Sequence, residues 1–252
     1  MFAQQCNEDI SYEKILAPEE GFVEAATRFL AQPDAVGCNV TMPFKLDAYH
    51  LAQVDDQAAK DAKAVNTLMN HEDGTIKGFN TDGVGLVNDL LNNGVALKNK
   101  RVLLIGAGGA ARGVISPLLE AGVASLIMTN RTIARAEQVA NETNHTRLSV
   151  VSLDNIASVK PHVIINSTAA SLHNELPCHM DAKVLEDCEV VYDMVYKNSP
   201  TLFMREAKAR GVNQCLDGLG MLVEQAASAF QIWTGKTPRT QTVVSELRAI
   251  VS

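Results

Sequence analysis

A glycine-rich turn is the first feature of this chain that could do chemistry. It follows an apolar run, Val102–Ile105, and precedes a helical pattern and a second apolar run, Ala124–Met128. This order predicts a strand, a turn, a helix and a second strand. Glycines let a backbone approach a pyrophosphate, and a helix N-terminus offers free N–H groups and partial positive charge. The residues that we expect to bind a dinucleotide here are Gly106, Ala107, Gly108, Gly109 and Ala110.

The end of the second predicted strand indicates which dinucleotide would bind. It carries Asn130, Arg131 and Thr132, with Arg135 one helical turn further on, and no Asp or Glu to hold a free ribose 2′-hydroxyl. Guanidinium groups in this position suit a 2′-phosphate, so the sequence predicts NADP rather than NAD. On the turn alone, two alternatives remain open, because such turns also bind FAD or merely pack a helix on a sheet.

Lys45 and Asp82 are the candidate catalytic pair. Each follows a short apolar run, at the strand-end position where α/β sites are built. Hydride transfer to a ketone leaves an alkoxide, and a lysine ammonium held by a carboxylate can polarise the carbonyl and supply the proton. In the alternative interpretation, Lys45 is a solvated charge at the start of a helix, and Thr81 and Asp82 merely cap the next one. Three amides are equally ambiguous, either as turn formers or as hydrogen-bond partners of a polyol: Asn39, Asn66 and Asn80.

The elements that must position these residues form two α/β blocks. In the first block we expect strands at 13–16, 37–42, 65–70 and 76–78, with helices at 20–30 and 55–63. The second block begins with a helix at 84–91. It continues with strands at 102–105, 124–128, 148–151, 162–166, 189–193 and 212–215, and with helices near 132–142 and 201–210. The remainder is helical, at 220–233 and 239–250.

This alternation predicts an α/β fold with two doubly wound domains and parallel sheets. We expect a substrate domain at 1–82, a Rossmann-type NADP domain at 83–217, and C-terminal helices at 218–252 that return to the substrate domain. The NADP domain is thus inserted into a discontinuous substrate domain, and the ligands would bind in the cleft between the two.

Composition excludes several classes of partner. The chain has 252 residues and a formal net charge of −7, so a nucleic-acid partner is not expected. No apolar run is long enough to cross a bilayer. The 5 cysteines are odd in number and scattered, which fits reduced thiols in the cytoplasm, and no pattern of metal ligands is present. We expect a cytoplasmic monomer or homodimer that binds a small-molecule substrate and no metal.

Seven motifs in order along nearly the whole chain resemble the shikimate dehydrogenases of the aromatic amino acid pathway. They read NVTMPFK, AVNTL, GFNTDGVG, LLIGAGGAARG, TNRT-xx-R, YDMVY and DGLGMLVEQAA. The resemblance implies a reversible, NADPH-dependent reduction of 3-dehydroshikimate to shikimate. It implies that Lys45 is the acid/base and Asp82 its partner. The substrate contacts that it implies are Thr41, Asn66, Tyr196 and Gln225. Cofactor contacts at the glycine turn and at Asn130–Arg135 are implied too, with Met194 and Gly218 at the nicotinamide end.

The chain departs from the family pattern in two places. The stretch Asn166–Ser171 stands where family members usually have a loop with more glycine. The chain also begins at a point that resembles the middle of a helix, after the family's first strand and its serine loop. We therefore expect NADP binding with reduced turnover of shikimate. The alternatives are a quinate/shikimate dehydrogenase and an NADP-binding protein that is catalytically impaired.

Overall fold

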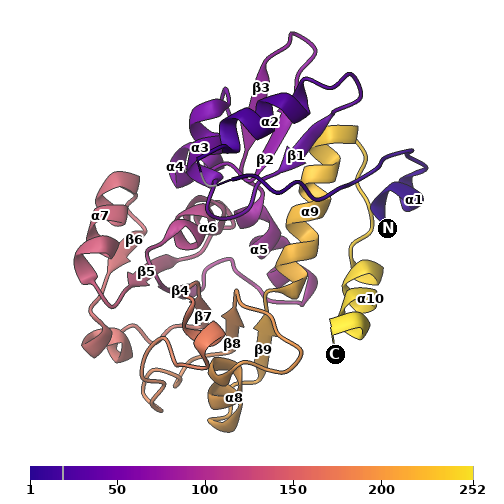
Figure 1. Ribbon diagram of the computed structural model, residues 1–252. Helices are drawn as coiled ribbons and strands as arrows, with labels where there is room; N and C mark the ends of the chain where they lie inside the picture. Colours follow the sequence, from indigo (N-terminus) through magenta and orange to yellow (C-terminus); the bar gives the residue numbers. More distant parts are fainter. Residues whose placement is uncertain (19, 252) are drawn as a thin grey trace.

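The strands form two separate sheets joined by helices, in a computed structural model that describes residues 1–18 and 20–251 (Figure 1). The larger sheet has the order β6-β5-β4-β7-β8-β9, and every neighbouring pair is parallel. Its strands are β4 (Arg101–Ile105), β5 (Ser125–Thr129), β6 (Leu148–Val150), β7 (Val163–Asn166), β8 (Val190–Asp193) and β9 (Gln214–Asp217). The expected α/β fold with a parallel, doubly wound sheet is confirmed.

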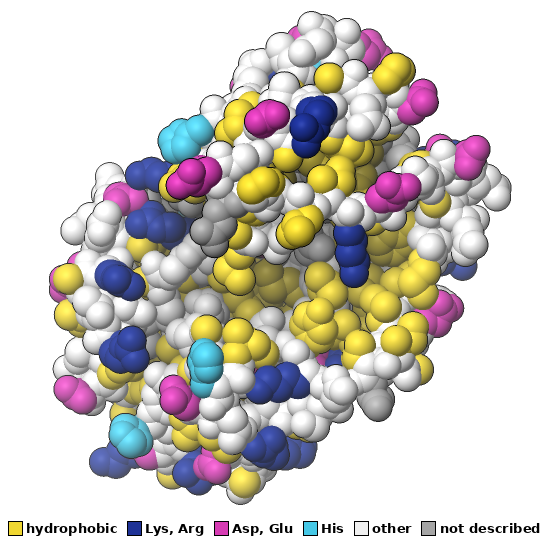
Figure 2. All heavy atoms as spheres, in the orientation of Figure 1, with side chains coloured by type: hydrophobic (Ala, Val, Ile, Leu, Met, Phe, Trp, Pro, Cys, Tyr) yellow, Lys and Arg dark blue, Asp and Glu magenta, His cyan; other side chains and the backbone are white. Residues whose placement is uncertain are grey.

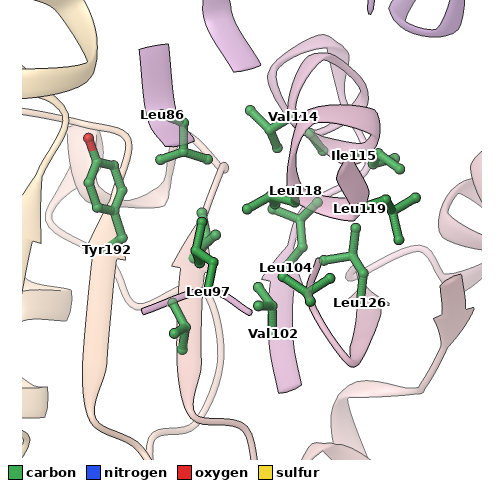
Figure 3. Packing of buried hydrophobic residues seen from close by; sticks show 14 of the residues in the cluster. Leu86, Leu97, Val102, Leu104, Val114, Ile115, Leu118, Leu119, Leu126 and Tyr192 are labelled. Carbon is green, nitrogen blue, oxygen red and sulfur yellow. The ribbon is translucent and has the colours of Figure 1, made fainter. Parts of the chain in front are cut away.

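Both faces of the larger sheet are covered because its central strands are apolar on both sides. On one face, Val102 and Leu104 of β4 pack with Val114 and Leu118 (Figure 3). On the other face, Leu103 of β4 packs with residues from the opposite set of helices. The first set is α5 (Asp82–Asn92), α6 (Gly109–Glu120) and α7 (Ile133–Thr143); the second is η1 (Leu153–Ser158) and α8 (Leu202–Ala209). A further short helix, η2 (Ala170–His173), follows β7.

The smaller sheet has the order β1-β2-β3 and is antiparallel throughout. Its strands are β1 (Gly37–Asn39), β2 (Thr67–Asn70) and β3 (Ile76–Phe79). The helices of this block are α1 (Phe2–Cys6), α2 (Phe22–Leu30), α3 (Lys45–Leu51) and α4 (Gln57–Ala62). A separate core joins Phe22 and Leu30 of α2 to Leu68 of β2.

Three expectations for the first block are wrong. The segment Glu13–Leu16 is extended but forms no strand in the described residues, because a strand requires a hydrogen-bonded neighbour and Leu16 is 97% exposed. The three strands are not parallel, since a tight hairpin at 71–75 can join β2 and β3 only in opposite directions. β1 also ends at Asn39 rather than Met42, where the chain turns into the segment before α3.

Two helices connect the blocks. α5 leads from the smaller sheet into the larger one, and α9 (Leu219–Thr234) leads back to the smaller sheet, where Trp233 Nε1 donates to Leu68 O at 2.9 Å. α5 and α9 approach so closely that a Cβ at Gly85 would come within 2.8 Å of the Gln225 backbone. α10 (Gln241–Val251) packs on α9 and returns Arg248 to Asp217 of β9 at 2.5 Å. None of the described helices is both long and apolar enough to cross a membrane.

Candidate active site

The side chains of Lys45 and Asp82 form an ion pair between the first residues of two helices. Lys45 Nζ lies 2.6 Å from Asp82 Oδ2, and the side chains are 29% and 15% exposed. Lys45 starts α3, as the alternative interpretation of the sequence had it, yet its ammonium is not simply solvated. Asp82 starts α5, where the helix dipole favours a carboxylate. The pair is therefore partly sheltered but still reachable by a small ligand.

Asn66 connects this pair to the returning helix α9. Its buried amide nitrogen donates to Asp82 Oδ1 at 3.0 Å and to Gln225 Oε1 at 3.3 Å. The same nitrogen donates to Thr81 Oγ1 at 2.9 Å. The structure thus brings together four of the residues implied by the resemblance, from four separate segments: Lys45, Asn66, Asp82 and Gln225.

Thr81 has a role that sequence reasoning missed. It is the N-cap residue of α5, but its side chain makes no capping hydrogen bond there. Instead, Thr81 N donates to Asn66 Oδ1 at 2.9 Å, and the hydroxyl joins the Asn66 and Gln225 amides. Thr81 lies directly before Asp82 within the motif GFNTDGVG. This adjacency to a candidate catalytic residue is the sequence signal that could have indicated its role. It fixes the rotamer of Asn66 and the entry of the chain into α5.

Asn80 and Asp56 hold the backbone of the loop that leads into Asp82. Asn80 Nδ2 donates to Ala64 O at 3.0 Å, and Asn80 Oδ1 accepts from Asp82 N at 3.1 Å. Asp56 Oδ2 accepts from Asn80 N and from Ala59 N, both at 2.9 Å, and so caps α4 as it holds the loop. Asn80 is therefore a structural amide, and Asn66 is the one that faces the ion pair.

Thr41 and Tyr196 lie outside this hydrogen-bonded group. Thr41 is exposed in the turn that precedes Lys45, where its carbonyl accepts from Phe44 N at 3.1 Å. Tyr196 is 40% exposed in the loop after β8. In the described part of the chain, neither side chain hydrogen-bonds to Lys45, Asn66, Asp82 or Gln225.

The glycine turn has the geometry of an anion cradle. Gly106 has a φ of +121°, and a Cβ there would come within 2.3 Å of Ser167 Oγ, so only glycine fits. A Cβ on Gly108 or Gly109 would meet nothing within 4 Å, which leaves open space above the turn. Gly108 is also the N-cap of α6 and provides no side-chain cap, so the first N–H groups of the helix, beginning at Gly109, remain available for a ligand. These features fit a pyrophosphate.

The end of β5 presents two cations beside this cradle. Arg131 and Arg135 are both exposed, and among the described residues neither guanidinium pairs with a carboxylate. Asn130 Nδ2 donates to Thr132 O at 2.8 Å, which shapes the turn into α7. Free guanidinium groups one helical turn apart fit a phosphate, because their donors match its oxygens.

Met194 and Gly218 lie against each other at the ends of β8 and β9. A Cβ at Gly218 would come within 2.1 Å of Met194 O, so this contact requires glycine. Met194 N donates to Asn166 O at 2.9 Å. The two residues expected at one end of the cofactor are thus neighbours, although they are 24 positions apart in the sequence.

The space between the two sheets connects these sites. Figure 2 shows the surface hollowed between the part that carries β1–β3 and the part that carries β7–β9, with hydrophobic side chains in the hollow. Two cavities, of about 380 and 350 Å³, lie beside α5. Neither of them is lined by Lys45, Asn66 or Asp82.

Comparison with known protein families identifies three matching regions. Residues 1–68 match the family described as the shikimate dehydrogenase substrate binding domain. Residues 88–186 match shikimate / quinate 5-dehydrogenase. Residues 218–248 match the shikimate 5′-dehydrogenase C-terminal domain.

Individual relatives match over nearly the full chain. Shikimate dehydrogenase (NADP(+)) of Alteromonas mediterranea is 68% identical, over 100% of this chain and 90% of its own length. The protein of the same name from Vibrio campbellii is 47% identical, over 98% of this chain and 89% of its own length.

Two solved structures are similar as well. An Ael1 enzyme from Pseudomonas putida has a TM-score of 0.91 and 39% identity, covering 98% of this chain and 90% of its own. Shikimate 5-dehydrogenase from Thermus thermophilus, in complex with NADP(H) and shikimate, has a TM-score of 0.85 and 31% identity, covering 100% and 92%.

Proposed function

This chain belongs to the shikimate dehydrogenase family, and we propose that it catalyses the reversible, NADPH-dependent reduction of 3-dehydroshikimate to shikimate. The observation that carries the proposal is the Lys45–Asp82 ion pair at 2.6 Å, joined through Asn66 to Gln225. It supplies a proton donor and convergent amides in the space that also faces the glycine cradle. We assign residues 1–82 and 218–252 to the substrate domain and 83–217 to the NADP domain.

We assign proton transfer to Lys45. In the reduction, the carbonyl carbon becomes an alcohol carbon and its oxygen takes a proton from the Lys45 ammonium; in the oxidation, Lys45 takes the proton back. Asp82 holds the ammonium in place through the 2.6 Å contact and balances its charge. Because the ammonium aims at the position where negative charge develops, it also stabilises the transition state.

The polar side chains other than Lys45 and Asp82 suit a cyclic polyol as the substrate. The amide of Asn66 and that of Gln225 can both donate and accept, which suits vicinal hydroxyls. We assign Thr41 and Tyr196 to further substrate contacts, as the resemblance to the family implies, and both residues are exposed. Neither is needed to hold Lys45, so they act on substrate affinity rather than on proton transfer.

The cofactor would be held by the cradle and by the end of β5. Gly106, Ala107, Gly108, Gly109 and Ala110 would hold the pyrophosphate, and Asn130, Arg131, Thr132 and Arg135 the adenosine 2′-phosphate. Met194 and Gly218 would contact the nicotinamide end. When bound, NADPH supplies the hydride for the carbonyl carbon.

A direct assay tests this function. Purified protein is mixed with shikimate and NADP⁺, and the formation of NADPH is followed by absorbance. We expect NADPH to form from NADP⁺, and NADH to form much more slowly when NAD⁺ replaces NADP⁺. Absence of NADPH at enzyme concentrations that bind stoichiometric NADP⁺ would contradict the proposal.

A further inference from the structure

The carboxylate of Asp193 is buried at the end of β8 and accepts hydrogen bonds from four groups. Its side chain has no exposed surface. Oδ2 accepts from Ser171 Oγ at 2.5 Å and from Thr201 Oγ1 at 2.7 Å. Oδ1 accepts from Asn166 Nδ2 at 3.0 Å and from Val195 N at 3.1 Å. Four donors therefore converge on one buried carboxylate.

These bonds connect three segments at one edge of the larger sheet. Asn166 ends β7, directly opposite Asp193 in the parallel register. Ser171 lies in the following loop within η2, and Thr201 caps α8. Asn166 Oδ1 additionally accepts from Thr168 N at 3.0 Å and Thr168 Oγ1 at 2.7 Å. The loop at 167–173 is therefore fixed by side-chain hydroxyls.

The position of this carboxylate points to a role in ligand binding rather than in folding alone. The interior of the sheet is already filled by apolar side chains such as Ile164 and Val191. Asp193 instead lies at the carboxyl end of its strand, where open α/β sheets bind ligands. It directly precedes Met194, which contacts Gly218, and it lies three positions before Tyr196 in the sequence. Burial raises the pKa of Asp193 above its usual range, and the hydrogen bonds from Ser171, Thr201, Val195 and Asn166 offset part of that rise.

We propose that Asp193, with Ser171 and Thr201, is a positioning residue that holds the 167–173 loop and the Met194–Tyr196 turn in place to receive the nicotinamide half of the cofactor. This inference rests on the proposed function, because it takes NADP as the ligand. Ser171 is the residue to test, because it lies within the stretch Asn166–Ser171, where this chain departs from the family pattern. The hydrogen bond from the Ser171 hydroxyl to Asp193 restricts the conformations that this loop can adopt.

The test compares two ligands that share only the adenosine end. NADP⁺ spans both ends of the site, whereas 2′,5′-ADP carries the 2′-phosphate but no nicotinamide. Both are titrated into the wild type, Ser171→Ala and Ser171→Gly by calorimetry. Ser158→Ala is the matched control, because its hydroxyl also donates one hydrogen bond, to Asn155 O at 2.7 Å, but in an exposed helix away from these loops.

We expect both Ser171 variants to raise the Kd of NADP⁺ about three- to tenfold, as loss of one hydrogen bond implies. The Kd of 2′,5′-ADP should stay the same, and Ser158→Ala should change neither. An equal rise for the two ligands, or no rise for NADP⁺, would overturn the positioning role while leaving the proposed function intact. Failure of the wild type to bind either ligand would contradict the proposed function and this inference with it.

Discussion

Gly83 at the start of α5 lies directly against the backbone carbonyl of Gly113 on α6. A Cβ at position 83 would come within 2.2 Å of that oxygen and within 2.5 Å of Pro117. A Cβ at position 113 would lie 3.6 Å from the Asn80 amide, an ordinary contact. This crossing places Asp82, next to Gly83, against the helix whose N-terminus forms the anion cradle. The Lys45–Asp82 pair and the helix that follows the glycine turn are thus linked by a close backbone contact.

The first prediction follows from this asymmetry. Gly83→Ala should lower the free energy of unfolding by about 1–3 kcal/mol, because backbone cannot move aside cheaply. It should also lower kcat/KM by displacing Asp82. Gly113→Ala is the matched control and should be neutral or stabilising by up to about 1 kcal/mol, the helix preference for alanine over glycine. Urea unfolding of both variants checks this, and equal destabilisation would refute the close contact.

Cofactor choice gives the second prediction. Arg131→Ala removes one of the free guanidinium groups at the end of β5. A hydrogen bond to a charged group contributes about 1.5–3 kcal/mol, so NADP⁺ should bind about tenfold more weakly or worse, while NAD⁺ binding changes little. Arg28→Ala, on α2 of the other block, is the control, because its side chain is 75% exposed. A variant that binds NADP⁺ as tightly as the wild type would show that the 2′-phosphate lies elsewhere.

The third prediction concerns an ion network between the blocks. Glu142 of α7 pairs with Arg112 of α6 at 2.7 Å and with Lys63, which follows α4, at 3.2 Å. Hydrogen bonds from Arg112, Gln138 and Lys63 lower the pKa of Glu142 to about 2. Because the Glu142 carboxylate binds a proton more tightly in the unfolded chain than in the fold, the network stabilises the fold at pH values above the ordinary carboxyl pKa. That stabilisation is lost as the pH falls toward 2.

This predicts a specific pH signature. The difference in unfolding free energy between the wild type and Glu142→Gln should be largest near neutral pH and should shrink as the pH falls below about 4. High salt should reduce it at neutral pH as well, since these side chains are partly exposed. A difference that is independent of pH would mean that Glu142 contributes by packing alone.

The larger sheet could be predicted well because its signals are local. Its strands are continuous apolar runs closed by glycine or polar turns, so β4, β5 and β7 lie within one residue of their expected positions. The smaller sheet was harder, because strand direction and the presence of a neighbour are not encoded in a short pattern. The segment Glu13–Leu16 was expected to be a short strand, yet it pairs with no neighbouring strand in the described residues.

In the candidate site, too, some contacts could be predicted from the sequence and others could not. The Lys45–Asp82 pair could be expected from motifs that follow apolar runs, and the structure brings the two side chains together. The three-way role of the Asn66 amide could not, because Gln225 lies 159 residues further along the chain and reaches it only through the close crossing of α5 and α9. The role of Asp193 could not be predicted for the same reason, since Asn166 and Ser171 lie 27 and 22 residues before it in the sequence and Thr201 lies 8 residues after it.

The most direct test of the account is a single-turnover measurement on Lys45→Met, with enzyme in excess over NADP⁺ and with saturating shikimate. General acid–base groups contribute about 10²–10⁴-fold, so we predict a loss of that size in the rate of NADPH formation. NADP⁺ affinity should be nearly unchanged. Lys77→Met is the matched control, because Lys77 also pairs with a carboxylate, Asp55 at 3.0 Å, but outside the site, and it should react at the wild-type rate. A Lys45→Met rate close to that of the wild type would contradict the central claim that this ammonium transfers the proton.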